Sequence, residues 1–311
     1  MLASLLFNSV MGPTVDYPMN LRVVMQVLSG LVIGRRFTRA DVRALKTTFI
    51  PALILVISML TTNWLFGFII ARFTDLDLVT ALFVAAPGGV SDLALIAIDF
   101  GATMEHVALL QLFRFVFVVL AFPPMLKWIL KIPTPTEVIH SEGGGNSHTN
   151  RTVDFPLTLL FAAIGGVGFY LLSIPAGAIL GAIIATVVFN LVTERAYYPP
   201  WAKTVAQAGA GTYIGSKITL QVMIASDVLF VPALLLIVEL IFMALTTGAL
   251  LRWLGKMSWP TALFSATPAG IQEIGLISDE MGLETPKIVL MHTVRVMAVL
   301  SFLPFLVHFV M

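Results

Sequence analysis

One stretch of this chain occurs twice, and it constrains the fold more than any other feature. Residues 80–101 return as residues 261–282, with ten of the 22 positions identical. In each copy an apolar run is interrupted by proline and glycine and is then followed by a carboxylate. This order is expected where a membrane helix is broken in order to handle a solute.

The repeat extends well beyond this stretch. A shift of 181 positions aligns the two halves without a gap and pairs identical residues: Gln26 with Gln207, Gly30 with Gly211, Gly34 with Gly215, Pro51 with Pro232, Arg114 with Arg295 and Pro123 with Pro304. A chance match of apolar segments would not hold one register for so long. The sequence therefore indicates an internal duplication.

Composition places this duplication in a membrane. Of the 311 residues, 58% are hydrophobic and only 11% are charged, and the mean hydropathy is +0.97. These values are typical of a polytopic membrane protein. A net charge of +1 without any basic stripe argues against nucleic-acid binding. The lack of cysteine excludes thiolate catalysis and cysteine-bound metal.

Residues 131–154 are rich in glycine, proline and threonine and are predicted to form a cytoplasmic linker. The linker divides a first repeat, residues 1–130, from a second repeat, residues 155–311. Apolar segments are predicted at 21–34, 48–71, 107–130, 155–173, 175–191, 205–215, 228–253 and 287–310, with a basic loop over 35–46. The segment 155–173 has no counterpart in the first half, so the first repeat is expected to be N-terminally short by about one helix of roughly 20 residues.

The positions of Lys and Arg distinguish three possible paths through the membrane, because cytoplasmic loops carry the excess of these residues. If the Pro-Gly segments enter and leave on one side, thirteen Lys and Arg lie inside and three outside. If every segment crosses, the numbers are seven and nine; if only the short glycine-bearing segments stay on one side, they are eight and eight. We therefore predict an all-α, polytopic transmembrane helical bundle of two inverted repeats, each with a re-entrant Pro/Gly-broken segment.

The expected substrate-binding residues surround the two breaks and the helices that follow them. They are Pro87, Gly88, Gly89, Ser91, Asp92, Gln111 and Arg114 in the first half, and Pro268, Gly270, Gln272, Glu273, His292 and Arg295 in the second. The half-helix after each break offers free N–H groups and a positive dipole end, which favour an anion. Gln111 and His292 lie three residues before the arginines and hence on the same helix face.

Two interpretations of these charged residues are open. In the first, Asp92 with Arg114 and Glu273 with Arg295 form buried structural ion pairs. In the second, the arginines hold a substrate anion, and Asp92 or Glu273 binds a coupling ion. Glu239 aligns with Ser58, and is either a proton site or the partner of a polar neighbour.

The motifs PGGVSD (87–92) and PAGIQE (268–273), each followed by a helix with the repeated arginine, resemble the AbrB duplication family of bacterial inner-membrane proteins. The resemblance covers nearly the whole chain and implies a multi-pass protein of the bacterial cell inner membrane. The family usually has Glu where this chain has Asp92. Its labels are regulator of gene expression and ammonia monooxygenase. The residues support neither label, because there is no small DNA-binding domain and the five histidines lack metal-ligand spacing.

These features predict a secondary transporter for a small anionic organic solute, with elevator-like alternating access and no enzymatic activity. The elevator analogy is one of architecture, drawn from carboxylate transporters with inverted repeats and glycine-containing hairpins. The expected partners are the lipid bilayer, the solute, a proton or sodium ion for coupling, and a second copy of the chain in a homodimer; no nucleic acid, metal or cofactor is expected. The alternative functions are a membrane-embedded sensor or regulator with the linker as its output and, ranked last, a membrane monooxygenase.

Overall fold

The computed structural model describes residues 19–120, 151–174, 176–217, 226–268, 274, 278 and 281–309. Within these residues every element is helical and there is no strand. The helices are α2 Met19–Arg35, α3 Arg39–Phe73, α4 Leu78–Ala85, α5 Val90–Ala97, the 3-10 helix η1 Ile98–Phe100, α6 Met104–Leu120, α8 Arg151–Leu171, α9 Gly177–Thr193, α10 Pro200–Lys217, α12 Ser226–Trp253, α13 Trp259–Ala266 and α15 Thr285–His308. The predicted all-α class is confirmed for the described part of the chain.

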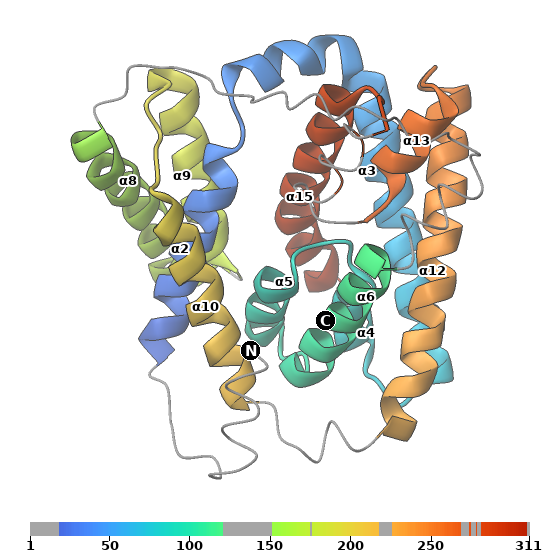
Figure 1. Cartoon of the computed structure of the whole chain (residues 1–311). Helices are drawn as coiled ribbons and strands as arrows, with labels where there is room; N and C mark the ends of the chain where they lie inside the picture. Colours follow the sequence, from blue (N-terminus) through green and yellow to red (C-terminus); the bar gives the residue numbers. More distant parts are fainter. Residues whose placement is uncertain are drawn as a thin grey trace.

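The helices form two groups, which Figure 1 shows side by side. The first group contains α2, α8, α9 and α10, with α9 packed against both α8 and α2, and α10 packed against α2. The second group contains α3, α4, α5, α6, α12, α13 and α15, in which α12 packs against α3, α6 and α13. The first group includes the two helices that precede α10 in the second half of the chain, so the groups do not coincide with the sequence halves.

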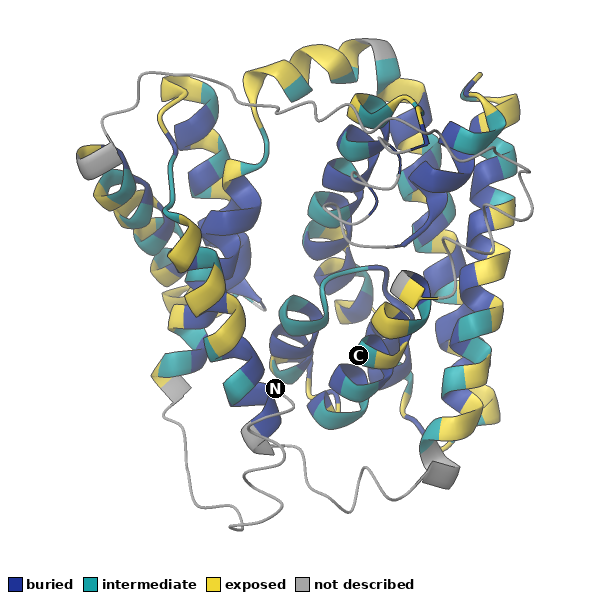
Figure 2. Cartoon of the chain, in the orientation of Figure 1, coloured by how far each residue is buried: buried dark blue, intermediate teal, exposed yellow. Residues whose placement is uncertain are grey.

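Four of the described helices are long and apolar enough to cross a membrane: Thr48–Phe73 within α3, Val153–Leu171 within α8, Leu229–Trp253 within α12, and Thr285–His308, which is α15. Their outer faces carry large exposed apolar side chains, including Phe68, Ile164 and Phe242. Figure 2 shows this exposed surface along the outside of α8 and α12, with buried residues turned toward the interior. Apolar surface of this extent is typical of helices that face lipid, which indicates a membrane protein.

Equivalent helices in the two halves have equivalent ends. Shifted by 181 positions, the bounds of α4 coincide with those of α13. The side chains of Asp77 and Ser258, at equivalent positions, each accept a hydrogen bond from the backbone N–H three residues further on. Such N-caps satisfy a donor that the first turn of a helix cannot pair internally. The duplication seen in the sequence thus reappears as repeated local structure.

The first broken segment folds as a helical hairpin of α4 and α5. The backbone N–H of Thr103, just after η1, donates to Oγ1 of Thr80 in the first turn of α4 at 2.8 Å, so the end of the hairpin lies beside its start. The return begins at Gly101, where φ is 69°, and Gly282 has φ of 63° at the equivalent position. Glycine adopts this left-handed conformation without a steric penalty. In Figure 1, α4 lies in the lower part of the molecule and α13 in the upper part.

The basic segment predicted as a loop over residues 35–46 is largely helical, which corrects the sequence interpretation. α3 begins directly after Thr38, which forms a capping box with Asp41. The helix then bends at Thr48, with φ −113° and ψ 16°, three residues before Pro51. Proline disfavours a regular helix over the preceding turn, because its ring conflicts with the carbonyl four residues earlier. A helix on the surface keeps charged side chains in water just as a loop does. A high density of charged residues therefore does not distinguish a surface helix from a loop.

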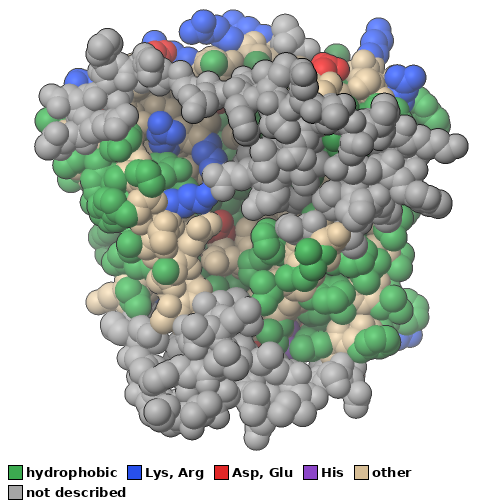
Figure 3. Space-filling model, in the orientation of Figure 1, with side chains coloured by type: hydrophobic (Ala, Val, Ile, Leu, Met, Phe, Trp, Pro, Cys, Tyr) green, Lys and Arg blue, Asp and Glu red, His purple; other side chains and the backbone are tan. Residues whose placement is uncertain are grey.

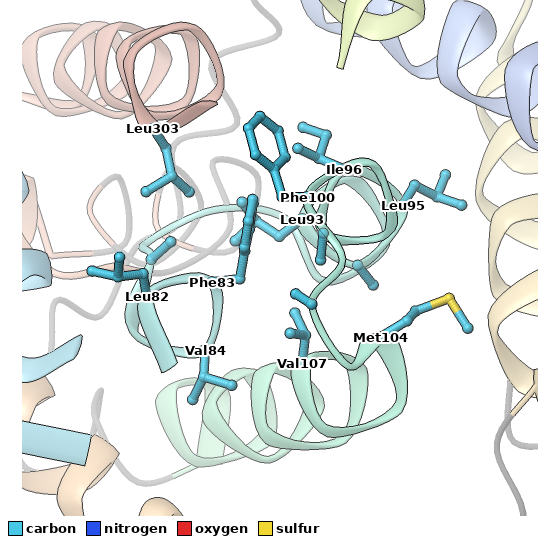
Figure 4. Packing of buried hydrophobic residues seen from close by; sticks show 14 of the residues in the cluster. Leu82, Phe83, Val84, Leu93, Leu95, Ile96, Phe100, Met104, Val107 and Leu303 are labelled. Atoms are coloured by element: carbon cyan, nitrogen blue, oxygen red, sulfur yellow. The ribbon is translucent and has the colours of Figure 1, made fainter. Parts of the chain in front are cut away.

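A packed apolar core holds the first hairpin in place (Figure 4). Phe83 of α4 lies against Phe100 of η1, with ring centroids 5.7 Å apart, and Val107 of α6 lies beside them. Leu303 of α15 belongs to the same buried cluster. The last described helix of the second half therefore covers the broken segment of the first. In a bilayer such packing stabilises the fold through close van der Waals contact, because lipid chains are as apolar as these side chains.

Candidate functional site

The first break interrupts the helix between Ala85, where α4 ends, and Val90, where α5 begins. Ala86 and Gly89 on either side of Pro87 have extended backbone, with ψ of 129° and 136°. Proline lacks an N–H and disfavours helical geometry in the residue before it, which accounts for the position of the break. The carbonyls in the last turn of α4 are left without helical partners.

Two side chains of α6 supply donors to these carbonyls. The Nε2 group of Gln111 lies 2.8 Å, 3.0 Å and 3.0 Å from the carbonyl oxygens of Phe83, Val84 and Ala86. Arg114 donates through Nη1 to the oxygens of Ala86 at 2.6 Å and Ala85 at 3.3 Å, and through Nη2 to that of Gly88 at 3.2 Å. The predicted Gln–Arg face of α6 therefore holds the broken segment by its backbone.

The second half has the same arrangement at equivalent positions. Nε2 of His292 lies 2.9 Å from the carbonyl oxygen of Phe264, and Nη1 of Arg295 donates to that of Thr267 at 2.9 Å. Both side chains come from α15 and are buried. Each repeated arginine thus contacts the carbonyl of the residue just before the proline of its own half.

A cavity of about 430 Å³ opens between the two groups of helices. Its walls come from α2, the first break with the start of α5, α6, α10, Pro268 and α15, and its polar lining consists of Ser29, Arg36, Ser91, Asp92, Gln111, Arg114, Lys203, Gln207 and Arg295. In Figure 3, Lys and Arg side chains gather along a hollow in this face, with an acidic side chain deeper inside. The volume is within the range of small-molecule sites.

Most of the described residues that the sequence singled out meet in this cavity. Those that line it are Gly88, Gly89, Ser91, Asp92, Gln111, Arg114, Pro268 and Arg295. Pro87 and His292 are buried but are not part of its lining. Gly270, Gln272 and Glu273 lie outside the described residues. The pairing of Glu273 with Arg295 therefore stays a prediction.

Asp92 faces α2 and not Arg114. Its carboxylate lies beside the hydroxyl of Ser29 and within the electrostatic reach of Arg36. In the described part of the chain, Asp92 and Arg114 form no ion pair within 4.0 Å. The interpretation of these two residues as a structural ion pair is thus wrong for the first half. Asp92 stands in the first turn of α5, where the helix dipole stabilises a carboxylate.

Two cationic residues that line the cavity, Arg36 just after the end of α2 and Lys203 of α10, are absent from the predicted site. One signal was present, because Lys203 aligns with Arg22 when the halves are superimposed by 181 positions. The predicted site contained only residues at the breaks and on the helices that follow them, and none from the side of α2 and α10. Together with Arg114 and Arg295, four basic side chains line the cavity against the single described carboxylate of Asp92.

An ion pair ties α2 to the end of the first hairpin. Nη2 of the buried Arg22 lies 2.7 Å from Oδ1 of Asp99 in η1, and Nε2 of Gln26 donates to the same carboxylate at 3.3 Å. This contact joins the two helix groups in the conformation that the structure describes, and it would have to break if the groups moved apart. Among the described residues, no three His, Asp or Glu side chains gather as a metal site.

The helices and the cavity define a class, that of a helical membrane protein with a basic cavity between two groups of helices. The chain belongs to the AbrB family: residues 1–311 match the family described as "Transition state regulatory protein AbrB". One relative is "Uncharacterized protein YhjN" of Bacillus subtilis (strain 168), 24% identical over 294 residues that make up 90% of this chain and 76% of the relative. Another is "Putative regulator AbrB" of Escherichia coli (strain K12), 24% identical over 321 residues, covering 100% of this chain and 88% of the relative. No solved structure matches the chain.

Proposed function

We propose that this protein is a secondary transporter for a small anionic organic solute, which binds in the 430 Å³ cavity. The observation that carries the proposal is the convergence of Arg114, Arg295, Arg36 and Lys203 on one cavity in a chain with membrane-spanning helices. Buried or partly buried cations of this density are expensive in a membrane and mark solute pathways. A guanidinium group binds carboxylate with two parallel hydrogen bonds.

The backbone at the first break adds donors to the same site. Gly88, Gly89 and Ser91 line the cavity at the N-terminus of α5, where N–H groups point away from the helix. The Ser91 hydroxyl can donate or accept a hydrogen bond. An anionic group at this end of α5 would be held by the helix N-terminus as well as by Arg114. A carboxylate solute fits this combination of charge and donors.

The cavity lies where relative movement of the two helix groups would open and close it. α2 and α10 form one wall, and α5, α6 and α15 form the opposite wall. Displacement of the second group against the first would carry the two broken segments and their arginines together. This is the elevator-like form of alternating access, in which substrate sites lie at broken helices between structural repeats.

We further propose that the two repeats are inverted and that both broken segments are re-entrant. In that arrangement Asp77, at the start of α4, faces outside, and Ser258, at the start of α13, faces the cytoplasm. Both side chains are exposed, and the chain contains no cysteine, so single cysteines can be introduced without background. We expect Asp77→Cys to react with an impermeant maleimide in intact cells and Ser258→Cys to react only after permeabilisation. Equal reactivity of both variants from outside would contradict inversion.

Transport is tested with purified protein reconstituted into liposomes. We expect saturable uptake of at least one radiolabelled carboxylate among acetate, pyruvate, succinate and glutamate, and none of glycerol, because a neutral solute gives the four cations no counter-charge. Liposomes without protein provide the control for leakage. Absence of uptake for all four anions, with protein that remains folded and inserted, would contradict the proposed function.

A further inference from the structure

Glu239 is a buried carboxylate that the cavity does not account for. It lies near the middle of the apolar span Leu229–Trp253 in α12 and is 1% exposed. Both of its carboxylate oxygens are buried, and neither has a hydrogen-bond partner among the described residues. It is not part of the cavity lining. An ionised carboxylate without donors in such surroundings costs several kcal/mol.

The second half of the chain alone carries this acid. At the equivalent position of the first half stands Ser58, whose hydroxyl is satisfied by Oγ1 of Thr247 at 2.7 Å. The next residue of α12, Leu240, belongs to a buried apolar cluster that also contains Phe264 of α13. The two halves therefore differ here, with a neutral hydroxyl in the first and a carboxyl group in the second. This asymmetry indicates a function that only the second half has.

The charged side chains on the helices around α12 determine the electrostatic environment of Glu239. α12 packs against α3, α6 and α13. α13 has no titratable side chain, the charged residues of α3 (Arg39, Asp41, Arg43, Lys46 and Arg72) lie near its ends, and Glu105 and His106 lie in the first turn of α6. Arg114 of α6 is the remaining charged side chain on these helices; it lies within electrostatic reach of Glu239, although the two form no ion pair within 4.0 Å among the described residues, and Arg295 of α15 lies within electrostatic reach of Arg114. Glu239 therefore communicates with the cavity through Arg114.

We propose that Glu239 is a proton-binding site, linked through Arg114 to anion binding in the cavity. A proton needs only the carboxylate itself, whereas a metal cation needs several additional oxygen ligands. Binding of the proton converts the carboxylate to a neutral carboxylic acid, so Arg114 loses its nearby negative charge and attracts an anion more strongly. Linkage is reciprocal, so a bound anion also favours the proton. The linkage rests on the proposed transport function, while the proton site itself does not.

The proton site is tested without any solute. Infrared difference spectra between low and high pH, recorded on the whole protein in lipid, are expected to contain the C=O band of a protonated carboxyl group in apolar surroundings. Glu239→Gln should lose this band, and Glu239→Asp should keep a shifted one. Glu105→Gln, the same substitution on a neighbouring helix, should leave the band unchanged. An unaltered band in Glu239→Gln, or a band that depends on sodium at constant pH, would overturn the site.

The linkage is tested with succinate as the probe. In the wild type, the apparent affinity for succinate should fall as the pH rises through the titration of one linked proton, with a slope of at most about tenfold per pH unit, and should then level off. Glu239→Gln should bind succinate with that slope lost, since glutamine resembles the protonated acid, whereas Glu105→Gln should retain the slope. An equal slope in Glu239→Gln would overturn the linkage. If neither succinate nor the other carboxylates bind to the wild type, the linkage falls together with the proposed function, and the infrared result still decides the proton site.

Discussion

Replacing Arg114 and Arg295 together by alanine is expected to abolish binding of the anionic solute. Each guanidinium lines the cavity, is almost fully buried and holds the carbonyls of its own broken segment. Hydrogen bonds to charged groups contribute about 1.5–3 kcal/mol each, so each single alanine variant should weaken binding roughly tenfold to hundredfold. Affinity is measured by calorimetry with the carboxylate that gives the strongest uptake.

A control is needed because alanine also leaves backbone carbonyls without donors. His292→Leu removes the hydrogen bond to the Phe264 carbonyl but leaves Arg295 in place, and His292 is not part of the cavity lining. We expect this variant to lower thermal stability with a smaller effect on affinity than Arg295→Ala. If both variants weaken binding equally, the arginine acts only by holding the break. Arg295→Lys tests geometry, since lysine keeps the charge without the planar pair of donors.

Substitution of Gly165 by alanine is expected to destabilise the first helix group strongly. An added Cβ on Gly165 of α8 would contact the backbone of Gly181 in α9 and would lie 2.5 Å from Cβ of Ala185. Backbone atoms cannot move aside as the end of a flexible side chain can, so α8 and α9 would have to separate. Overpacking of this kind costs about 1–3 kcal/mol. Loss of thermal stability is measured by the melting temperature of the purified protein in detergent.

Gly168 on the same helix provides the matched control, because nothing lies within 4 Å of a Cβ added there. Gly168→Ala should be neutral or stabilising, since alanine favours a helix by up to about 1 kcal/mol over glycine. The two substitutions differ only in the space that they meet. Equal melting temperatures for the two variants would contradict the close packing of α8 on α9. Because α9 packs against α2, which lines the cavity, Gly165→Ala should also weaken solute binding.

Much of the candidate site was predictable because the duplication repeats chemistry as well as hydrophobicity. Arg114 and Arg295 were identified from their equivalent positions, and the structure brings both to one cavity. Gln111 and His292 were predicted to share a face with the arginines, and both contact broken segments. The repeat does not predict the hydrogen-bond partner of each side chain, because an arginine can donate to a carboxylate or to backbone carbonyls.

The predicted site lacks the residues at α2 and α10, the two helices that lie opposite the breaks. Arg36 directly follows the end of α2 and Lys203 belongs to α10, and these helices are far in sequence from the broken segments and have no unusual motif. Their side chains reach the cavity only because these two helices pack against each other across from α5. Periodicity within one helix carries no information on which distant helix faces it.

The amino-acid sequence is sufficient to predict a helical membrane protein with an internal duplication in which each half breaks at proline. These features follow from local causes: apolar length, the missing N–H of proline, and identical residues in one register. The bonding of Arg114 to carbonyls, the position of Asp92 beside Ser29 and the set of helices that enclose the cavity follow from the packing of the whole fold. A buried charge takes the partner that packing brings within reach, and packing depends on all the helices at once.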